Sequence, residues 1–252
     1  MDPPPAARYG WAMADLALSS SRPGGLVFAA GIAGIAVQNL IYRDFLAGFQ
    51  PAPDWLPLRA PLAVLFGAVA LAAAAGIATG HRVVGSARML LAWFAALAVA
   101  FHVPVLVAHL TSGGAWAVAC EVIALGGITA MLALPDSAAG RVAFAASLPA
   151  FGLFHFLYLD YIVSVIPGWI PGPTFWAIAT GIALITAGAS LLSGRHARLA
   201  AILTTVMFGS WVVLLHVPRV IERRHADEWT SMFIATAMCG GAWLFGSTRR
   251  VA

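Results

Sequence analysis

Long runs of apolar residues alternate with short polar segments along the whole chain. Eight such runs lie at roughly 24–42, 60–79, 88–110, 115–134, 142–162, 173–193, 199–217 and 229–246. Each is close to the ~20 residues that an α-helix needs to cross the ~30 Å hydrocarbon core of a bilayer. Strands are excluded, because the runs do not alternate polar and apolar positions and open sheet edges are not tolerated in lipid. The pattern predicts an all-α, polytopic membrane protein with eight transmembrane helices.

Short segments repeat between the first four runs and the last four. HVP occurs at 102–104 and again at 216–218, and NLIYRDF (39–45) aligns with HFLYLDY (155–161). Because a unit of four helices is even, the two units have the same orientation, related by a pseudo-twofold axis along the membrane normal. We therefore predict two tandem four-helix bundles. The matching pairs are Tyr42 and Tyr158, Asp44 and Asp160, Gly67 and Gly181, Gly80 and Gly194, His102 and His216, and Gly126-Gly127 and Gly240-Gly241.

The repeat sets the predicted domain boundaries. We expect a cytoplasmic N-terminal segment at 1–23, a first membrane unit at 24–134, a linker at 135–141, a second unit at 142–246 and a cytoplasmic tail at 247–252. The first 23 residues are rich in proline and serine and lead directly into the first apolar run. That run therefore reads as a retained membrane helix rather than a cleaved signal peptide.

Charge is sparse and unevenly placed. Only 10% of the residues are charged, against about 25% in soluble domains. All 14 basic residues are arginines, which are scattered through the loops, so no basic stripe indicates a nucleic-acid partner. Nine arginines fall on one side of the predicted spans and five on the other. The positive-inside rule then places both termini in the cytoplasm, with the chain in the bacterial inner (plasma) membrane.

His216 is the first candidate for chemistry. It lies 18 residues after Arg198, about 27 Å along a helix, so it should sit near the outer membrane boundary with Asp160. Pro218 should end or kink the helix just past His216 and free backbone carbonyls beside it. His216 is then either a ligand or proton-transfer group, or a capping histidine bonded to a carbonyl or carboxylate.

Other polar side chains are predicted near this layer. Arg219 should reach Asp160 and form a bidentate guanidinium–carboxylate pair. Glu121 needs a partner, for which His102, His109 and Arg43 are candidates. His155 and Tyr158 share a helix face, where interhelical hydrogen bonding is the alternative to a catalytic role. The candidate catalytic residues are His216, Asp160, Arg219 and His155; the candidate binding residues are Tyr158, Glu228, Trp229, His102, Glu121 and Asp44.

Metal and haem sites receive less support from the sequence. Cys120 and Cys239 are not in a CxxC motif, which disfavours a dithiol relay or a zinc–thiolate centre. His102 and His216 could be symmetric axial ligands of a haem, but a proline two residues later disturbs each helix where a ligand must be rigid. No metal is assigned on this basis.

The second half resembles a known family. The stretch FGLFHFLYLDYIVSVIPGWIPGP, then SWVVLLHVPRV and EWTS, resembles the DoxX-like (DoxX/DoxD) family of bacterial four-helix integral membrane proteins. The resemblance covers about 142–246, with a degenerate copy at about 28–134. It implies a membrane component of a redox or quinone-linked system that works with a redox partner protein. The first copy departs from the second, with Val105 at the position of Arg219 and Asn39 at that of His155, which places the site in the second half.

Two other functions stay open at this point. A small-molecule or ion transporter is supported by the tandem repeat. Against it, the prolines cluster near the helix ends rather than in paired mid-membrane breaks. A scaffold or assembly factor without any site is the third interpretation.

Overall fold

The described part of the chain is helical throughout. The computed structural model describes residues 5–135 and 138–247, and of residues 5–21 only the backbone; no strand occurs in these ranges. In chain order the helices are α1 (Pro5–Tyr42), α2 (Arg59–Ala78), α3 (Val83–Leu97), α4 (Val103–Ala108), α5 (Gly113–Ala133), α6 (Ala138–Leu157), α7 (Leu159–Val165), α8 (Pro173–Ser193), α9 (Ala197–Trp211), α10 (Val217–Arg223) and α11 (Ala226–Ser247). Two π-helical segments, η1 (Ala98–His102) and η2 (Val212–His216), join α3 to α4 and α9 to α10.

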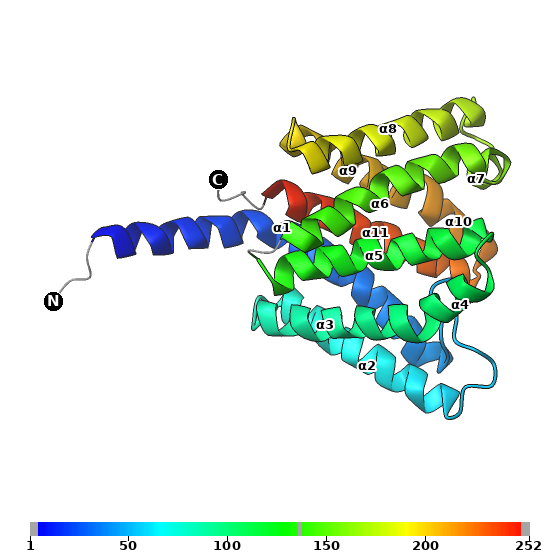
Figure 1. Cartoon of the computed structure of the whole chain (residues 1–252), viewed down its shortest axis with the longest axis horizontal. Coiled ribbons are helices and arrows are strands. Elements are labelled where there is room, and N and C mark those ends of the chain that lie inside the picture. The colour runs from blue at the N-terminus through cyan, green and yellow to red at the C-terminus, as the bar shows by residue number, and fades with distance from the viewer. Residues whose placement is uncertain (1–4, 136–137, 248–252) are drawn as a thin grey trace.

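The long helices form a closed ring. Neighbours pack in the order α1, α2, α3, α5, α6, α8, α9, α11 and back to α1, and α5 also contacts α11 across the ring. The long helices lie roughly side by side, with α4, α7 and α10 at one end (Figure 1). Each half of the chain thus supplies four long helices, and the ring closes where the first helix of one half meets the last helix of the other.

Seven of the helices are long and apolar enough to cross a membrane. These spans are Arg22–Tyr42, Arg59–Ala78, Val83–Ala108, Gly113–Ala133, Ala138–Leu157, Pro173–Ser193 and Ala197–Arg223. Large apolar side chains on them, such as Leu65, Leu203 and Val206, are exposed, as expected where a helix faces lipid. The chain is therefore a multi-pass membrane protein. The helix α11, with Asp227 and Glu228 in its first turn, is not among the seven; it packs on α1, α5 and α9.

Several helix boundaries differ from the sequence prediction, two of them in how the chain is divided into helices. We expected the first helix to begin near residue 24, but α1 begins at Pro5, continues through Pro23 and projects beyond the other helices (Figure 1). The fifth apolar run, predicted as one helix over 142–162, is broken at Tyr158 into α6 and α7. By contrast, α8 has the predicted bounds.

The helices do not end at the HVP motifs, so of the two predicted outcomes, an end or a kink, the end is contradicted. Instead, the turn before each proline widens into a π-helix, and the chain continues into α4 and α10. In this wider turn, Val103 N–H donates to Ala98 C=O and Val217 N–H donates to Val212 C=O. Proline lacks the N–H that a regular α-helix needs at this position. The turn that is wider by one residue lets the helix continue past it.

Glycines at matching positions bring equivalent helices into close contact. A Cβ atom on Gly67 would lie 2.8 Å from Asn39 Cβ, and one on Gly181 would lie 2.9 Å from His155 Cβ. The helices α1 and α2 thus pack as α6 and α8 do. Small residues allow such close backbone approach within membranes.

The ring closes at a second set of glycines. A Cβ atom on Gly127 would clash with the Gly140 carbonyl, and one on Gly240 with the Gly24 carbonyl, both from the facing helix. Gly127 therefore corresponds to Gly240, which is one residue out of the register predicted from the sequence. Gly126, the predicted partner of Gly240, has only Phe94 Cβ nearby, at 3.7 Å.

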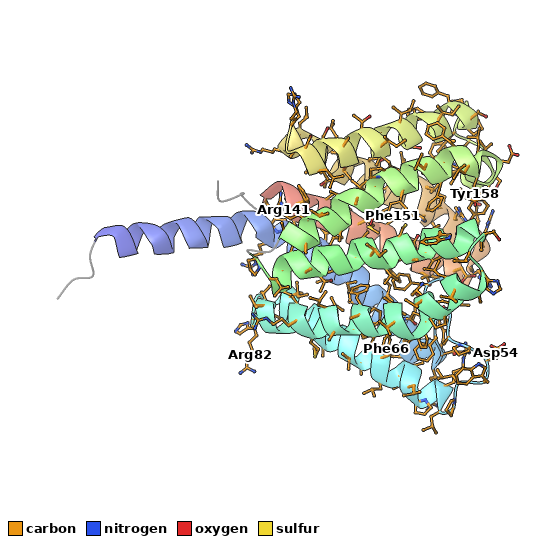
Figure 2. The ribbon with its side chains drawn as sticks, viewed as in Figure 1. Asp54, Phe66, Arg82, Arg141, Phe151 and Tyr158 are labelled. Atoms are coloured by element: carbon orange, nitrogen blue, oxygen red, sulfur yellow. The ribbon has the colours of Figure 1, made fainter. Side chains whose placement is uncertain are left out.

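The two ends of the bundle differ in their charged residues. Arg82 and Arg141 lie at one end, and Asp54 and Tyr158 at the other (Figure 2). We name them the arginine end, which contains the α2–α3 and α8–α9 turns, and the histidine end, which contains α4, α7, α10 and the 43–58 loop. The last turn of α11 reaches the arginine end, where α1 projects (Figure 1).

We predict that Gly240→Ala lowers the free energy of unfolding by about 1–3 kcal/mol, because the added methyl group overpacks the α1–α11 contact. The matched control, Gly126→Ala, adds a methyl group in ordinary contact distance and gains helix propensity, so it should be neutral or slightly stabilising. Thermal unfolding of both variants in the same detergent measures the difference. Equal loss of stability in the two variants would contradict the assigned register.

Candidate functional site

A buried ion pair lies at the histidine end of the second half. Arg219, in α10, faces Glu228, in the first turn of α11, with Nε 2.8 Å from Oε2 and Nη2 donating to Oε1 at 3.0 Å. The Glu228 side chain is only 8% exposed, and Arg223 Nη1 also donates to its Oε1 at 3.0 Å. Two guanidinium groups therefore hold one carboxylate, which fixes α10 against α11.

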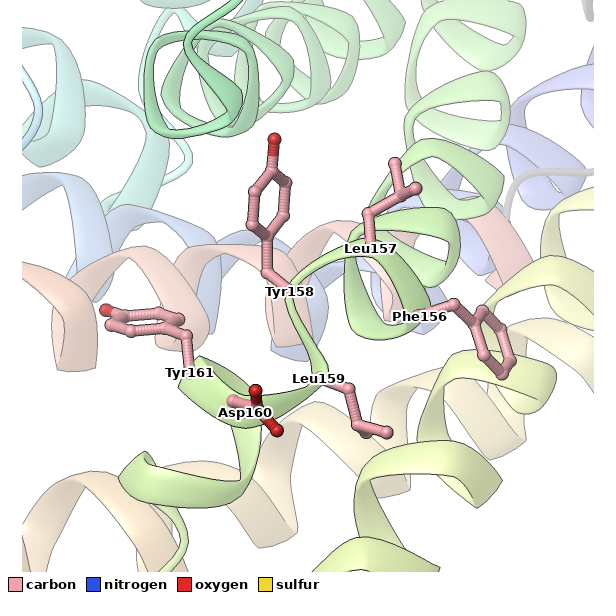
Figure 3. Close-up of a pocket in the computed structure, with 6 residues that line it drawn as sticks. All are labelled: Phe156, Leu157, Tyr158, Leu159, Asp160 and Tyr161. Carbon is pink, nitrogen blue, oxygen red and sulfur yellow. The ribbon is translucent and has the colours of Figure 1, made fainter.

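Arg219 does not pair with Asp160, contrary to the prediction. Asp160 is exposed on α7, and no ion pair joins it to another described residue. The break at Tyr158 redirects the chain, so that Asp160 borders an open hollow of about 410 Å³ (Figure 3). Phe156 and Leu159 lie on one side of this hollow, and Tyr158 and Tyr161 on the other (Figure 3).

His216 is the last residue of η2 and is half-buried. Its Nδ1 atom is buried, yet no hydrogen bond to it is present in the described part of the chain. His216 precedes Arg219 by three residues in the continuous stretch of η2 and α10. Its Nδ1 atom is therefore a vacant hydrogen-bonding group one helical turn from the Arg219–Glu228 ion pair.

The other second-half candidates have defined contacts. His155 Nδ1 is 2.9 Å from the Phe151 carbonyl, one turn earlier in α6, and its ring stacks on Trp211 at 6.2 Å between centroids. The Tyr158 hydroxyl lies against Gly113, the first residue of α5, where a Cβ atom would collide with it. The His155 hydrogen bond lies within α6; the contacts that reach other helices are its ring stacking on Trp211 and the packing of Tyr158 on Gly113.

Trp229 follows Glu228 in the first turn of α11. Its ring stacks on Phe233 with centroids 5.9 Å apart, and more than a third of its surface is exposed. Trp229 therefore lies beside the ion pair without a hydrogen bond to it.

The equivalent histidine of the first half, His102, is bonded to a loop carbonyl. His102 is 4% exposed, and its Nε2 lies 3.1 Å from the Phe49 carbonyl, which fixes it as a capping histidine. The 43–58 loop turns inward there and buries Phe45, Leu46 and Phe49. Asp44 pairs with Arg59 and accepts from Phe45 N–H, so it is a loop-anchoring residue.

The histidine ends of the two halves use loop carbonyls differently. In the second half the Val165 carbonyl, at the end of α7, accepts a hydrogen bond from Arg219 Nη1 at 3.5 Å. In the first half, which has Val105 in place of Arg219, the Phe49 carbonyl is bonded to His102.

Glu121 lies on α5, and none of its predicted partners forms a hydrogen bond or ion pair with it. His102 is bound to Phe49, and in the described residues no hydrogen bond or ion pair joins Glu121 to His109 or Arg43. Its side chain is neither fully buried nor exposed.

Sequence reasoning missed a buried amide network. Asn39 and Gln50, both fully buried, exchange two hydrogen bonds at 2.7 and 3.2 Å. Gln38 donates to the Ala226 carbonyl at 3.0 Å and accepts from Thr230 at 3.2 Å, which ties α1 to α11. The signal was present, since adjacent amides in an apolar run require partners, but the partners are far apart in the sequence.

Known proteins give no further guide to this site. Neither the protein-family models, nor the curated proteins, nor the solved structures contain a match to the chain. Within the described residues, no group of three or more His, Cys, Asp or Glu side chains is placed to hold a metal ion.

We predict that Glu228→Gln lowers the free energy of unfolding by roughly 3 kcal/mol, because it leaves the half-buried Arg219 guanidinium without its counter-charge. Glu222→Gln, at an exposed position of α10, is the matched control and should change stability by less than about 0.5 kcal/mol. Chemical or thermal unfolding in one detergent compares them. If both substitutions are neutral, the ion pair does not hold α10 against α11.

Proposed function

We propose that the chain is a DoxX-like protein of the bacterial inner membrane and a membrane subunit of a redox system that binds a quinone next to His216. In this proposal α11 is the eighth span, and the two halves arose by duplication of a four-helix unit. The carrying observation is the contrast between His102, whose ring is bonded to a loop carbonyl, and His216, whose buried Nδ1 has no partner.

Equivalent geometry in the two halves supports duplication. Each half has a π-helical segment that ends in His-Val-Pro, and each has a left-handed residue before its third helix, Arg82 or His196. Left-handed residues also precede α2 and α8, at Leu58 and Gly172. Such irregular features at matching positions are hard to produce independently, because each depends on a specific local sequence.

The charge distribution supports an orientation. The arginines of the α2–α3 and α8–α9 turns lie at the arginine end, whereas most acidic residues with described side chains lie at the histidine end. By the positive-inside rule, the arginine end and both termini are cytoplasmic. The His216 site then faces the outer side of the membrane.

A quinone headgroup suits this site chemically. Its carbonyl oxygens accept hydrogen bonds, which the Nδ1–H tautomer of His216 can donate, and its ring is apolar enough to partition from lipid. The stacked His155 and Trp211 rings lie on the helices beside η2 and offer an aromatic surface. A bound quinone would supply an acceptor for two electrons, delivered by a redox partner protein. The chain's own residues would bind and orient it.

We predict that a short-chain benzoquinone quenches the tryptophan fluorescence of the purified protein, and that His216→Ala weakens its binding about tenfold. That factor corresponds to the ~1.4 kcal/mol expected for one lost hydrogen bond. Titration in detergent measures both affinities.

His102→Ala is the matched control, since it removes the equivalent ring from the first half. It should lower stability by about 1–3 kcal/mol, because the buried Phe49 carbonyl loses its partner, but leave quinone affinity unchanged. Absence of saturable quenching, or equal loss of affinity in both variants, overturns the quinone site. An absorption spectrum and metal analysis of the same sample reveal any haem or metal.

Transport is a second candidate, supported by the form that the helix interruption takes at the two HVP motifs. The third helix of each half is interrupted at a matching position, by η1 and η2. Paired interruptions at matching positions of a repeat are typical of transporter binding sites. Uptake of labelled ions or metabolites into proteoliposomes distinguishes the two functions. A protein that shows neither flux nor quinone binding is a scaffold.

A further inference from the structure

Glu121 lies inside the ring at membrane depth. It is eight residues along α5 from Gly113, about 12 Å, so it lies within the hydrocarbon region of that span. Leu125 and Ile128, which share its face of the helix, are fully buried, whereas Ile123 on the opposite face is half exposed. Ile128 packs against Gly241, so the face that carries Glu121 is turned toward α11.

No charged partner reaches this carboxyl. The charged and titratable groups of the elements packed against α5 are bound elsewhere or form no hydrogen bond or ion pair to Glu121 within the described part of the chain. On the first-half elements, Arg88 of α3 is bonded to the Ala133 carbonyl, His102 is bonded to the Phe49 carbonyl, and His109 follows α4. On α6, Arg141 is bonded to the Phe245 carbonyl and His155 to the Phe151 carbonyl. On α11, Asp227 pairs with His225, Glu228 pairs with Arg219 and Arg223, and Cys239 is bonded to the Thr205 carbonyl.

Glu121 nevertheless keeps accessible surface. It is deeply surrounded by protein atoms, yet its side chain is not closed off as those of Leu125 and Ile128 are. Glu121 is therefore less tightly enclosed than the two apolar residues that share its face. An ionised carboxylate without a counter-charge is very costly in such a place, whereas a neutral carboxylic acid is tolerated.

We propose that Glu121 is an intramembrane proton-binding site, which carries a proton in the resting protein and exchanges it with water that enters the ring. The repeat does not require an acid there. In the structural register of the last helices the equivalent residue is Ile234, which is buried and apolar. This proposal does not depend on quinone binding, because it concerns the resting protein without ligand.

Infrared spectroscopy of the full-length protein in lipid tests the site directly. We expect a carboxylic-acid C=O stretching band at neutral pH that is lost in Glu121→Gln and shifts when water is replaced by D₂O. Glu222→Gln, the same change at an exposed position, should leave the band intact. If Glu121→Gln removes no band, Glu121 is ionised and the proposal fails. If the band does not shift in D₂O, the carboxyl proton does not exchange with water, and the proposal fails as well.

Carbodiimide labelling provides a test that needs no variant. Dicyclohexylcarbodiimide adds to a protonated carboxyl: the acid proton moves to a carbodiimide nitrogen, the carboxyl oxygen bonds to the central carbon, and the acyl group then migrates to nitrogen with no atoms lost. Peptide mapping of the wild-type protein should find the adduct on Glu121 and not on Glu228, which two arginines hold ionised. An unlabelled Glu121 overturns the proposal. Protection by sodium ions overturns it in favour of a cation site.

Discussion

The ring depends on backbone contact at two glycine crossings, where α1 meets α11 and α5 meets α6. At each crossing a glycine on the last helix of one half lies against a carbonyl of the first helix of the other half. In lipid the hydrophobic effect does not drive helices together, so close packing of small residues must do so. These crossings set the position of α11, and through it the position of the Arg219–Glu228 pair and of η2 beside it.

The two halves have the same arrangement of helices but differ in the hydrogen bonds that their polar side chains make at the histidine end. The first half fills its histidine end with an inward-turning loop, a hydrogen-bonded amide pair and a histidine bonded to a loop carbonyl. The second half has His155 at the position of the amide Asn39 and Arg219 at the position of Val105, and Arg219 donates to the Val165 carbonyl. Within the described part of the chain, the buried Nδ1 atom of His216 has no hydrogen-bond partner.

Much of the membrane architecture could be predicted from the sequence. The thickness of the bilayer sets the length of each apolar run, and the positive-inside rule relates the placement of arginines to the orientation of the helices. Most helix boundaries follow from such reasoning. The bond between His102 and the Phe49 carbonyl does not, since the sequence suggested a capping role for His216 alone. The partner of Arg219 could not be predicted. It depends on the π-helical turn before Pro218, through which the chain continues into α10, and on the break at Tyr158, which carries Asp160 away. Neither feature has a periodic signature in the sequence.

The π-helical turns also have a consequence for how this chain can change length. An insertion within a regular span turns every later residue to a new side and exposes the wrong face to lipid. A π-helical turn already contains one surplus residue, so removing one from η2 would restore an α-helix and leave both flanking faces in place. At these two turns, a membrane helix can therefore gain or lose a residue while the residues on either side keep the faces that they present to lipid and to the protein. Both turns lie next to the two histidines.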